Sequence, residues 1–285
     1  MNPTPSPGNS GGIPQFDHVL VVIEENQSYE NVIGNPAAPF LNSLASRYAL
    51  ATNYFANAHP SLPNYFMLTV GATIATNDDF SGTVTQDNIV HALVNAGKSW
   101  RCYAESIPSV GYVGQDSGVY IRHHNPFSYL SDVLNDPAQA ANLVPASQLG
   151  SDLASNTLPN YAFIVPNAIH DGHNCPDGGT CANNDKIVQI DAWLQSTIQP
   201  VLNNSAFQSS GLLIVTFDEG DDVDMAHGGG HIATIVISGN ANSGLQSTTF
   251  FQHQSLLALT LTALRVSDLP GAASTAPSMG EFFQQ

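Results

Sequence analysis

The chain has 285 residues, of which 42% are hydrophobic, so it is long enough for one large domain with a substantial core. Only 10% of the residues are charged, and 23 acidic against 6 basic residues give a net charge of −17. This balance argues against nucleic acid as a partner, because binding it requires clustered Lys and Arg. It also argues against docking on anionic membranes. An anionic substrate would need a local source of positive charge, and a metal is the obvious one.

Residues 1–14 are rich in Pro, Gly, Ser and Asn, which predicts a flexible linker, and we expect residues 15–285 to form a single domain. No run approaches the roughly 20 apolar residues of a membrane span, so no stable membrane insertion is expected. The linker is what trimming of a leader would leave, which favours a secreted or periplasmic location. Cys175 and Cys181 bracket a turn-rich loop and either form a small disulfide ring or stay reduced, whereas Cys102 is expected to be buried and free.

Strand-like and helix-like segments alternate along the chain. In chain order, we expect a strand at 18–23, helices at 39–48, 62–68 and 87–96, strands at 100–104 and 161–165, a helix at 185–198, strands at 211–217 and 232–238, and a helix at 255–265. This alternation predicts an α/β fold, a three-layer αβα sandwich with a mostly parallel central sheet.

Two of the expected strands end in residues that can bind a metal. Glu24, Glu25 and Asn26 follow the first apolar run, and Asp218 and Glu219 follow the run at 211–217. Ligands on such sheets bind beyond the carboxyl ends of the strands, so the two groups together suggest one site for a hard cation. Alternatively, these acidic residues cap the helices that follow.

A serine stands at an expected loop-to-helix junction, in the segment His59-Pro60-Ser61-Leu62-Pro63-Asn64. Ser61 is either a helix N-cap or a nucleophile supported by the helix N-terminus. As a nucleophile it would need a base or a metal to activate its hydroxyl. Asn64 could then hydrogen-bond an oxygen on the same centre.

Three further groups of residues carry possible chemistry. Asp171 and His173 lie on a loop directly after the expected strand at 161–165, and they either chelate a metal or belong to a solvated polar loop. His231 follows three glycines and either completes the metal set or acts as a general acid. His124 either stabilises or protonates a leaving group, or has a structural role.

Taken together, these motifs resemble those of a known family. The segment 23–29 (IEENQSY) is similar to the Glu-Asn-x-Ser-Phe signature of the phosphoesterase family of bacterial acid phosphatases and phospholipases C, within the alkaline-phosphatase-like superfamily. Segments 59–65, 171–173, 216–220 and 228–238 resemble the nucleophile, Asp-x-His, Asp-Glu and Gly-rich motifs of that family, in family order. No Cys-x-Pro-x-Arg stands where sulfatases carry their nucleophile, which disfavours sulfate esters.

The resemblance implies a division of labour. Glu25, Asn26, Asp218 and Glu219 would hold a metal at Ser61, which would attack phosphorus and form a phosphoserine. Asn64 would steady a non-bridging oxygen. A second metal, or acid catalysis, would involve Asp171, His173 and His231.

The expected function is hydrolysis of phosphomonoesters, with a small phosphate ester as the substrate and one or two divalent ions (Ca²⁺, Mg²⁺, Mn²⁺ or Zn²⁺) as the cofactor. One alternative is a phosphodiesterase or phospholipase C that uses the same site. The alternative from another class is an acidic extracellular cation-binding protein in which Ser61 only caps a helix. The sequence leaves the metal and the oligomeric state open.

Overall fold

The computed structural model describes residues 12–283, so residues 1–11 of the expected linker lie outside it. The described chain builds one 8-stranded sheet in the order β4-β3-β5-β1-β6-β7-β2-β8. The strands are β1 (His18–Glu24), β2 (Ala49–Ala51), β3 (Trp100–Ala104), β4 (Leu143–Pro145), β5 (Tyr161–Val165), β6 (Gly211–Phe217), β7 (Thr234–Ile237) and β8 (Gln246–Ser247). Within these residues, no helix is both long and apolar enough to span a membrane.

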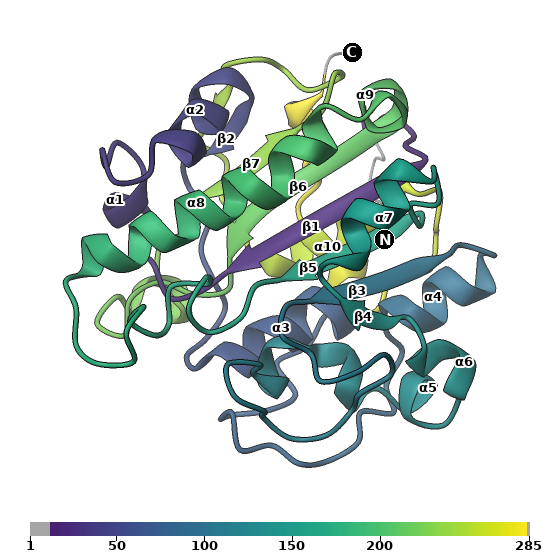
Figure 1. Ribbon diagram of the computed structural model, residues 1–285. Helices are drawn as coiled ribbons and strands as arrows, with labels where there is room; N and C mark the ends of the chain where they lie inside the picture. Colours follow the sequence, from purple (N-terminus) through teal and green to yellow (C-terminus); the bar gives the residue numbers. More distant parts are fainter. Residues whose placement is uncertain (1–11, 284–285) are drawn as a thin grey trace, which may run out of the picture.

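Helices cover both faces of the sheet, which confirms the predicted three-layer α/β fold. Figure 1 shows α8 crossing in front of β1 and β6, whereas α10 lies behind them. The longer helices are α2 (Pro39–Arg47), α3 (Ser61–Val70), α4 (Ile89–Asn95), α7 (Gln148–Ala154), α8 (Asn183–Leu202), α9 (Ser205–Ser210) and α10 (His253–Ala263). Shorter helical segments are α1 (Tyr29–Val32), α5 (Ser131–Leu134), α6 (Pro137–Ala140), η1 (Arg122–His124), η2 (Pro126–Tyr129), η3 (Ala226–Gly228), η4 (Gly271–Thr275) and η5 (Gly280–Phe282).

The central strand β1 fixes the position of the candidate site. It pairs in parallel with β5 on one side and with β6 on the other, with Glu24 opposite Phe217. Residues Val19 to Ile23 are at most 2% exposed, because both faces of β1 are covered by helices. The loops that leave β1, β5 and β6 therefore all start at the same edge of the sheet.

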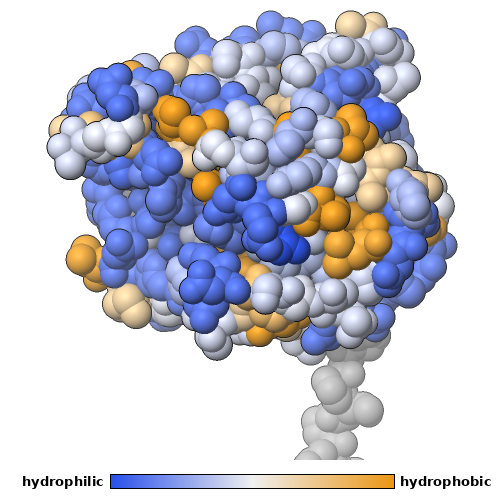
Figure 2. All heavy atoms as spheres, turned by 60° about the horizontal axis from the view of Figure 1, so that its bottom comes forward, coloured by the Kyte–Doolittle hydropathy of each residue, from blue (hydrophilic) through white to orange (hydrophobic). Residues whose placement is uncertain are grey.

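The sheet is mixed: β7 runs antiparallel to β6 and to β2. The sequence predicted the strand at 232–238 but not its direction. Because β7 is reversed, its first residues lie at the edge where β1 and β6 end. On the outside, Figure 2 shows a mostly hydrophilic face with apolar side chains in small separate groups. That surface agrees with the high content of polar residues.

Candidate active site

Five carboxylates gather where β1, β5 and β6 end. Glu24 ends β1 and Glu25 follows it, Asp218 and Glu219 follow β6, and Asp171 lies in the loop after β5; all five are at most 2% exposed. Backbone hydrogen bonds hold these segments together: the Glu25 N–H donates to the Asp171 carbonyl over 3.0 Å, and the Asp218 N–H donates to the Glu24 carbonyl over 2.9 Å.

Ser61 is the first residue of α3 and points into this group of carboxylates. Its hydroxyl donates to Glu25 Oε1 over 3.0 Å and lies 3.4 Å from Glu219 Oε1, and the residue is 3% exposed. The N-cap of α3 is Pro60, whose side chain makes no capping hydrogen bond. Instead, the Leu62 N–H donates to Asp78 Oδ1 over 2.9 Å, so a carboxylate from the following loop caps the helix that presents Ser61.

Two histidines complete the cluster. His124, 1% exposed, places Nε2 2.5 Å from Glu25 Oε2 and Nδ1 3.1 Å from Asp171 Oδ2. On the other side of Ser61, His59 Nδ1 lies 3.1 Å from Glu219 Oε2. The hydrogen bond with Glu219 raises the pKa of His59 to about 9.

Burial and the neighbouring charges shift the pKa values of these carboxyl groups. Burial raises the pKa of Asp218 well above its usual range, and the nearby charge of Glu25 adds to this shift. Burial likewise raises the pKa of Asp171 to about 6. For Glu25, burial is the largest single influence and acts upward, but the charge and hydrogen bond of His124, together with the charges of His173 and His123, outweigh it and lower the pKa to about 2. Such a cluster needs positive charge to hold its carboxylates ionised together.

The donor atoms fit a divalent cation. Glu25 Oε2, Asp171 Oδ2, Asp218 Oδ2 and both ring nitrogens of His124 are buried, and none of them makes a hydrogen bond of regular geometry within the described residues, although His124 lies close to both Glu25 and Asp171. Several of these atoms are close neighbours, so they converge without satisfying one another. One group that could hold an ion is Glu25, His124 and Asp171, and a second is His59, Glu219 and Asp222; in each, the ligand atoms lie within 4.8 Å of one another. Mixed carboxylate oxygens and imidazole nitrogens are donors for divalent metals.

Two amides named from the sequence lie beside this cluster. The Asn26 N–H donates to Asp218 Oδ1 over 3.2 Å, while its side-chain amide donates to Asp222. Asn64 is fully buried; its side-chain oxygen accepts the backbone N–H groups of residues 57 and 58, and its Nδ2 lies 3.3 Å from Glu219 Oε2. Asn64 thus braces the loop that leads to Ser61.

The two remaining predicted ligands are placed differently. The His173 N–H donates to Asp171 Oδ1 over 2.8 Å, and its ring centroid lies 6.5 Å from that of His124. The structure does not bring His231 into either group. Its Nδ1 faces Glu30 at 3.0 Å and its Nε2 faces a backbone carbonyl at 3.1 Å. The ring is also stacked on Tyr29, with centroids 4.4 Å apart.

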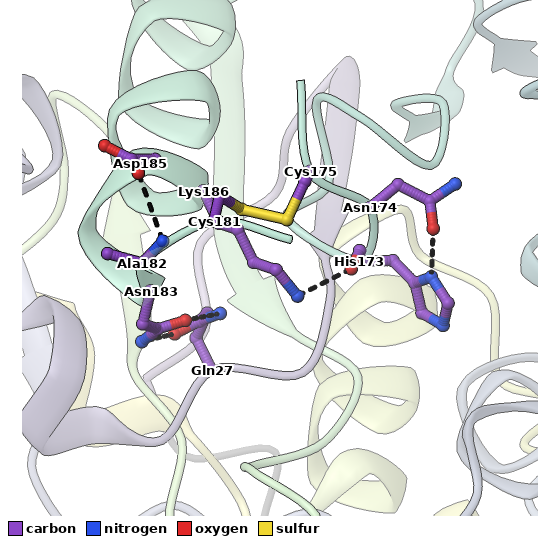
Figure 3. The surroundings of a disulfide bond; sticks show 9 residues. All are labelled: Gln27, His173, Asn174, Cys175, Cys181, Ala182, Asn183, Asp185 and Lys186. Atoms are coloured by element: carbon purple, nitrogen blue, oxygen red, sulfur yellow. Dashed lines mark hydrogen bonds between the residues drawn. A yellow bond between two sulfur atoms is a disulfide. The ribbon is translucent and has the colours of Figure 1, made fainter. Parts of the chain in front are cut away.

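The loop after Asp171 is closed by a disulfide between Cys175 and Cys181, and Figure 3 shows its surroundings. The sequence left this bond open; Cys102 is buried and free, as expected. Gly172 has φ +92°, a backbone conformation that L side chains rarely adopt, so this turn requires glycine.

Sequence reasoning missed several participants. His59 belongs to the predicted Ser61 segment but had no predicted role, although its position two residues before the serine was a signal. Asp222 and Asp78 lie in polar loops with no distinguishing pattern. His253, fully buried at the start of α10, contacts the Asp218 carbonyl through Nε2 at 2.6 Å, and no local signal announces that contact.

Comparison with known proteins assigns the chain to a family. The model of the phosphoesterase family matches residues 35–264. The chain is 32% identical over 278 residues to the phosphatidylinositol-3-phosphatase of Mycobacterium tuberculosis, covering 96% of this chain and 85% of that protein. It is 30% identical to a probable acid phosphatase of Kluyveromyces lactis, covering 85% of this chain and 57% of that protein. The chain thus spans somewhat more than half the length of the yeast relative.

Solved structures support the same fold at low sequence identity. The lipoteichoic acid synthase LtaP of Listeria monocytogenes superposes with a TM-score of 0.66 at 10% identity, over 94% of this chain and 78% of that one. A protein of the alkaline phosphatase superfamily from Vibrio parahaemolyticus superposes with a TM-score of 0.62 at 12% identity, over 95% and 73%. The chain therefore belongs to the phosphoesterase family and is an enzyme that hydrolyses phosphoric ester bonds, and its fold is similar to that of the alkaline phosphatase superfamily protein.

Proposed function

We propose that this enzyme is a metal-dependent phosphatase that hydrolyses phosphomonoesters through a phosphoserine intermediate on Ser61. The observation that carries the proposal is the hydrogen bond from the Ser61 hydroxyl to Glu25 Oε1, over 3.0 Å, inside a cluster of buried carboxylates that converge without regular hydrogen bonds among themselves. The names of the relatives, a phosphatidylinositol-3-phosphatase and several acid phosphatases, support the same reaction class.

The proposed reaction has two displacements at phosphorus. Ser61 Oγ attacks the phosphoryl group, and its proton passes to Glu25 Oε1, which accepts its hydrogen bond. The bond from phosphorus to the leaving oxygen breaks, and that oxygen takes up this proton and departs as the alcohol. Water then attacks the phosphoserine and gives one proton, through the same carboxylate, to Ser61 Oγ, so that phosphate and free serine result. The positive end of the α3 helix dipole favours the negative charge that both steps carry.

One or two metal ions would be held here, by Glu25, His124 and Asp171 in one group and by His59, Glu219 and Asp222 in the other, with Asp218 beside them. A divalent ion bound there supplies positive charge that stabilises the entering and leaving oxygens. His124 was expected to act on the leaving group, but both its ring nitrogens face carboxylates, so we propose it as a metal ligand. His173 and Asn26 border the cluster and would steady it. His231 is not one of the proposed metal ligands, because its ring contacts Glu30 and stacks on Tyr29.

Two further parts of the proposal concern setting and organisation. A disulfide in the loop next to the site favours an oxidising location, secreted or periplasmic. The single sheet that runs through the described residues supports one domain over residues 15–285.

The test is hydrolysis of p-nitrophenyl phosphate by metal-stripped protein, with and without added Ca²⁺, Mg²⁺, Mn²⁺ or Zn²⁺. We expect activity to return with at least one ion and to fall by orders of magnitude in Ser61→Ala. Ser205→Ala is the matched control, because Ser205 is also the first residue of a helix but is exposed. Full activity in Ser61→Ala would refute the serine mechanism. Turnover of a diester but not of the monoester would move the assignment to a phosphodiesterase.

A further inference from the structure

A cavity of about 410 Å³ opens beside the candidate active site. Its lining includes Asn26 and His173, which border the carboxylate cluster, and Asp222, which belongs to the second candidate metal group. Gln27, Asn183 and Lys186 line it as well. A substrate whose phosphate reaches Ser61 would extend its leaving group toward such a neighbouring space.

Lys186 is the informative residue of this cavity. The whole chain has 6 Lys and Arg residues, so a cation next to a cluster of carboxylates is conspicuous. Arg101 pairs with Asp152, whereas no ion pair within 4.0 Å in residues 12–283 involves Lys186. The Lys186 ammonium donates to the His173 carbonyl over 2.7 Å, which leaves two of its three N–H donors for a ligand.

The acidic residues of the cavity have other partners. Asp222 Oδ1 accepts from the Asn26 side-chain amide over 3.2 Å, and Asp221 Oδ2 accepts from the Asn31 side-chain amide over 2.5 Å. The amides give these carboxylates hydrogen-bond partners but do not remove their charge, and neither carboxylate lies within 4.0 Å of the Lys186 ammonium. Lys186 therefore lines, unpaired with them, a space large enough for a small organic anion.

The surrounding loop holds Lys186 in place. Figure 3 shows Lys186 at the start of α8, directly after the disulfide ring of Cys175 and Cys181, with its ammonium directed at His173. A reciprocal amide pair fixes the same turn: Asn183 donates to Gln27 over 2.8 Å and Gln27 donates to Asn183 over 3.1 Å. Gln27 lies two residues beyond Glu25, so the position of Lys186 is tied to that of the metal donors.

We propose that this cavity binds a second anionic group on the leaving portion of the substrate, and that Lys186 determines this specificity. The substrate class is a phosphomonoester whose alcohol carries a carboxylate or a further phosphate. The inference rests on the proposed phosphomonoesterase activity and adds to it the charge of the leaving group.

The experiment compares two substrates that differ by one carboxylate, glycerate 3-phosphate and glycerol 3-phosphate, with the metal-loaded enzyme. We expect a higher kcat/KM for glycerate 3-phosphate, and Lys186→Gln to lower that value about ten-fold, mainly through KM, because a charge-assisted hydrogen bond is lost. Any loss in kcat/KM for glycerol 3-phosphate should be smaller, so the ratio of the two kcat/KM values should fall in Lys186→Gln. Lys186→Arg should keep part of the preference, and Lys98→Gln is the control for the loss of one positive charge elsewhere.

The outcomes separate the two proposals. If neither substrate is hydrolysed by the unsubstituted enzyme, nor p-nitrophenyl phosphate, the phosphomonoesterase activity fails. If both substrates are hydrolysed but Lys186→Gln lowers both values equally, or leaves the preference intact, the anion-binding role of Lys186 is overturned while the activity stands.

Discussion

Replacing Asp78 by alanine removes the cap from the helix that carries Ser61. Asp78 Oδ1 accepts the Leu62 N–H over 2.9 Å, and the N-cap residue of α3 is a proline that makes no side-chain bond to the helix. Loss of a helix cap costs about 1 kcal/mol. If that free energy serves to hold Ser61 at 3.0 Å from Glu25, kcat should fall about five-fold in Asp78→Ala.

The assay is steady-state hydrolysis of p-nitrophenyl phosphate together with urea unfolding. Asp78→Ala should lower kcat and the free energy of unfolding, with little change in KM. Asp78→Asn should restore most of kcat, because the amide oxygen still accepts the Leu62 N–H. The neighbouring, exposed Asp79 is the matched control, and Asp79→Ala should behave like the unsubstituted enzyme.

Two results would refute this reasoning. Unchanged kcat in Asp78→Ala would show that the cap does not position the nucleophile. Equal gains in phosphate affinity in Asp78→Ala and Asp78→Asn would show that the carboxylate acts by its charge, as a competitor of the substrate phosphate at the helix N-terminus.

Three further predictions concern stability and reactivity. Asp152 is 3% exposed, pairs with Arg101 and accepts from the Tyr103 hydroxyl over 2.6 Å. We expect Asp152→Asn to lower the free energy of unfolding in urea by about 2 kcal/mol. This figure is smaller than the loss for a fully buried ion pair because Arg101 is partly exposed. Burial acts to raise the pKa of Asp152, but its hydrogen bonds lower the pKa below its usual value. The stability that Asp152 contributes should therefore be present above about pH 4 and be lost as the pH falls further. A free energy of unfolding that does not change over that pH range would contradict this. Burial raises the pKa of the Cys102 thiol, so iodoacetamide should label it only after unfolding, and rapid labelling of the folded protein would contradict its burial. Chelation should lower Tm by several degrees and the activating ion should restore it, since the ion binds the folded carboxylate cluster; a Tm independent of the ion would argue against the site.

Much of the fold could be predicted because its signals are local. The apolar runs at 18–23 and 211–217 match β1 and β6, and the carboxylates that follow them meet at one edge, as the rule for parallel strands requires. The strands β2, β4 and β8 were missed, because segments of two or three residues carry no measurable period. The direction of β7 could not be predicted, since an apolar run does not encode its orientation in the sheet.

The site was harder to predict because its contacts span long stretches of chain. Glu25, Ser61 and Glu219 could be proposed together, since each follows a recognisable strand end or helix start. The pairing of His59 with Glu219 depends on how the loop before α3 packs on the loop after β6. His231 stands next to a strand at the correct edge, but its ring packs on Tyr29, and sequence spacing does not report ring orientation.

The central claim is that Ser61 becomes phosphorylated during turnover. The most direct measurement is acid quenching of the metal-loaded enzyme during hydrolysis of p-nitrophenyl phosphate, followed by mass spectrometry of the peptide that contains Ser61. We predict phosphate on Ser61 in the unsubstituted enzyme, and neither phosphopeptide nor turnover in Ser61→Ala. Turnover at the normal rate in Ser61→Ala, with no phosphorylated peptide in either protein, would contradict the account.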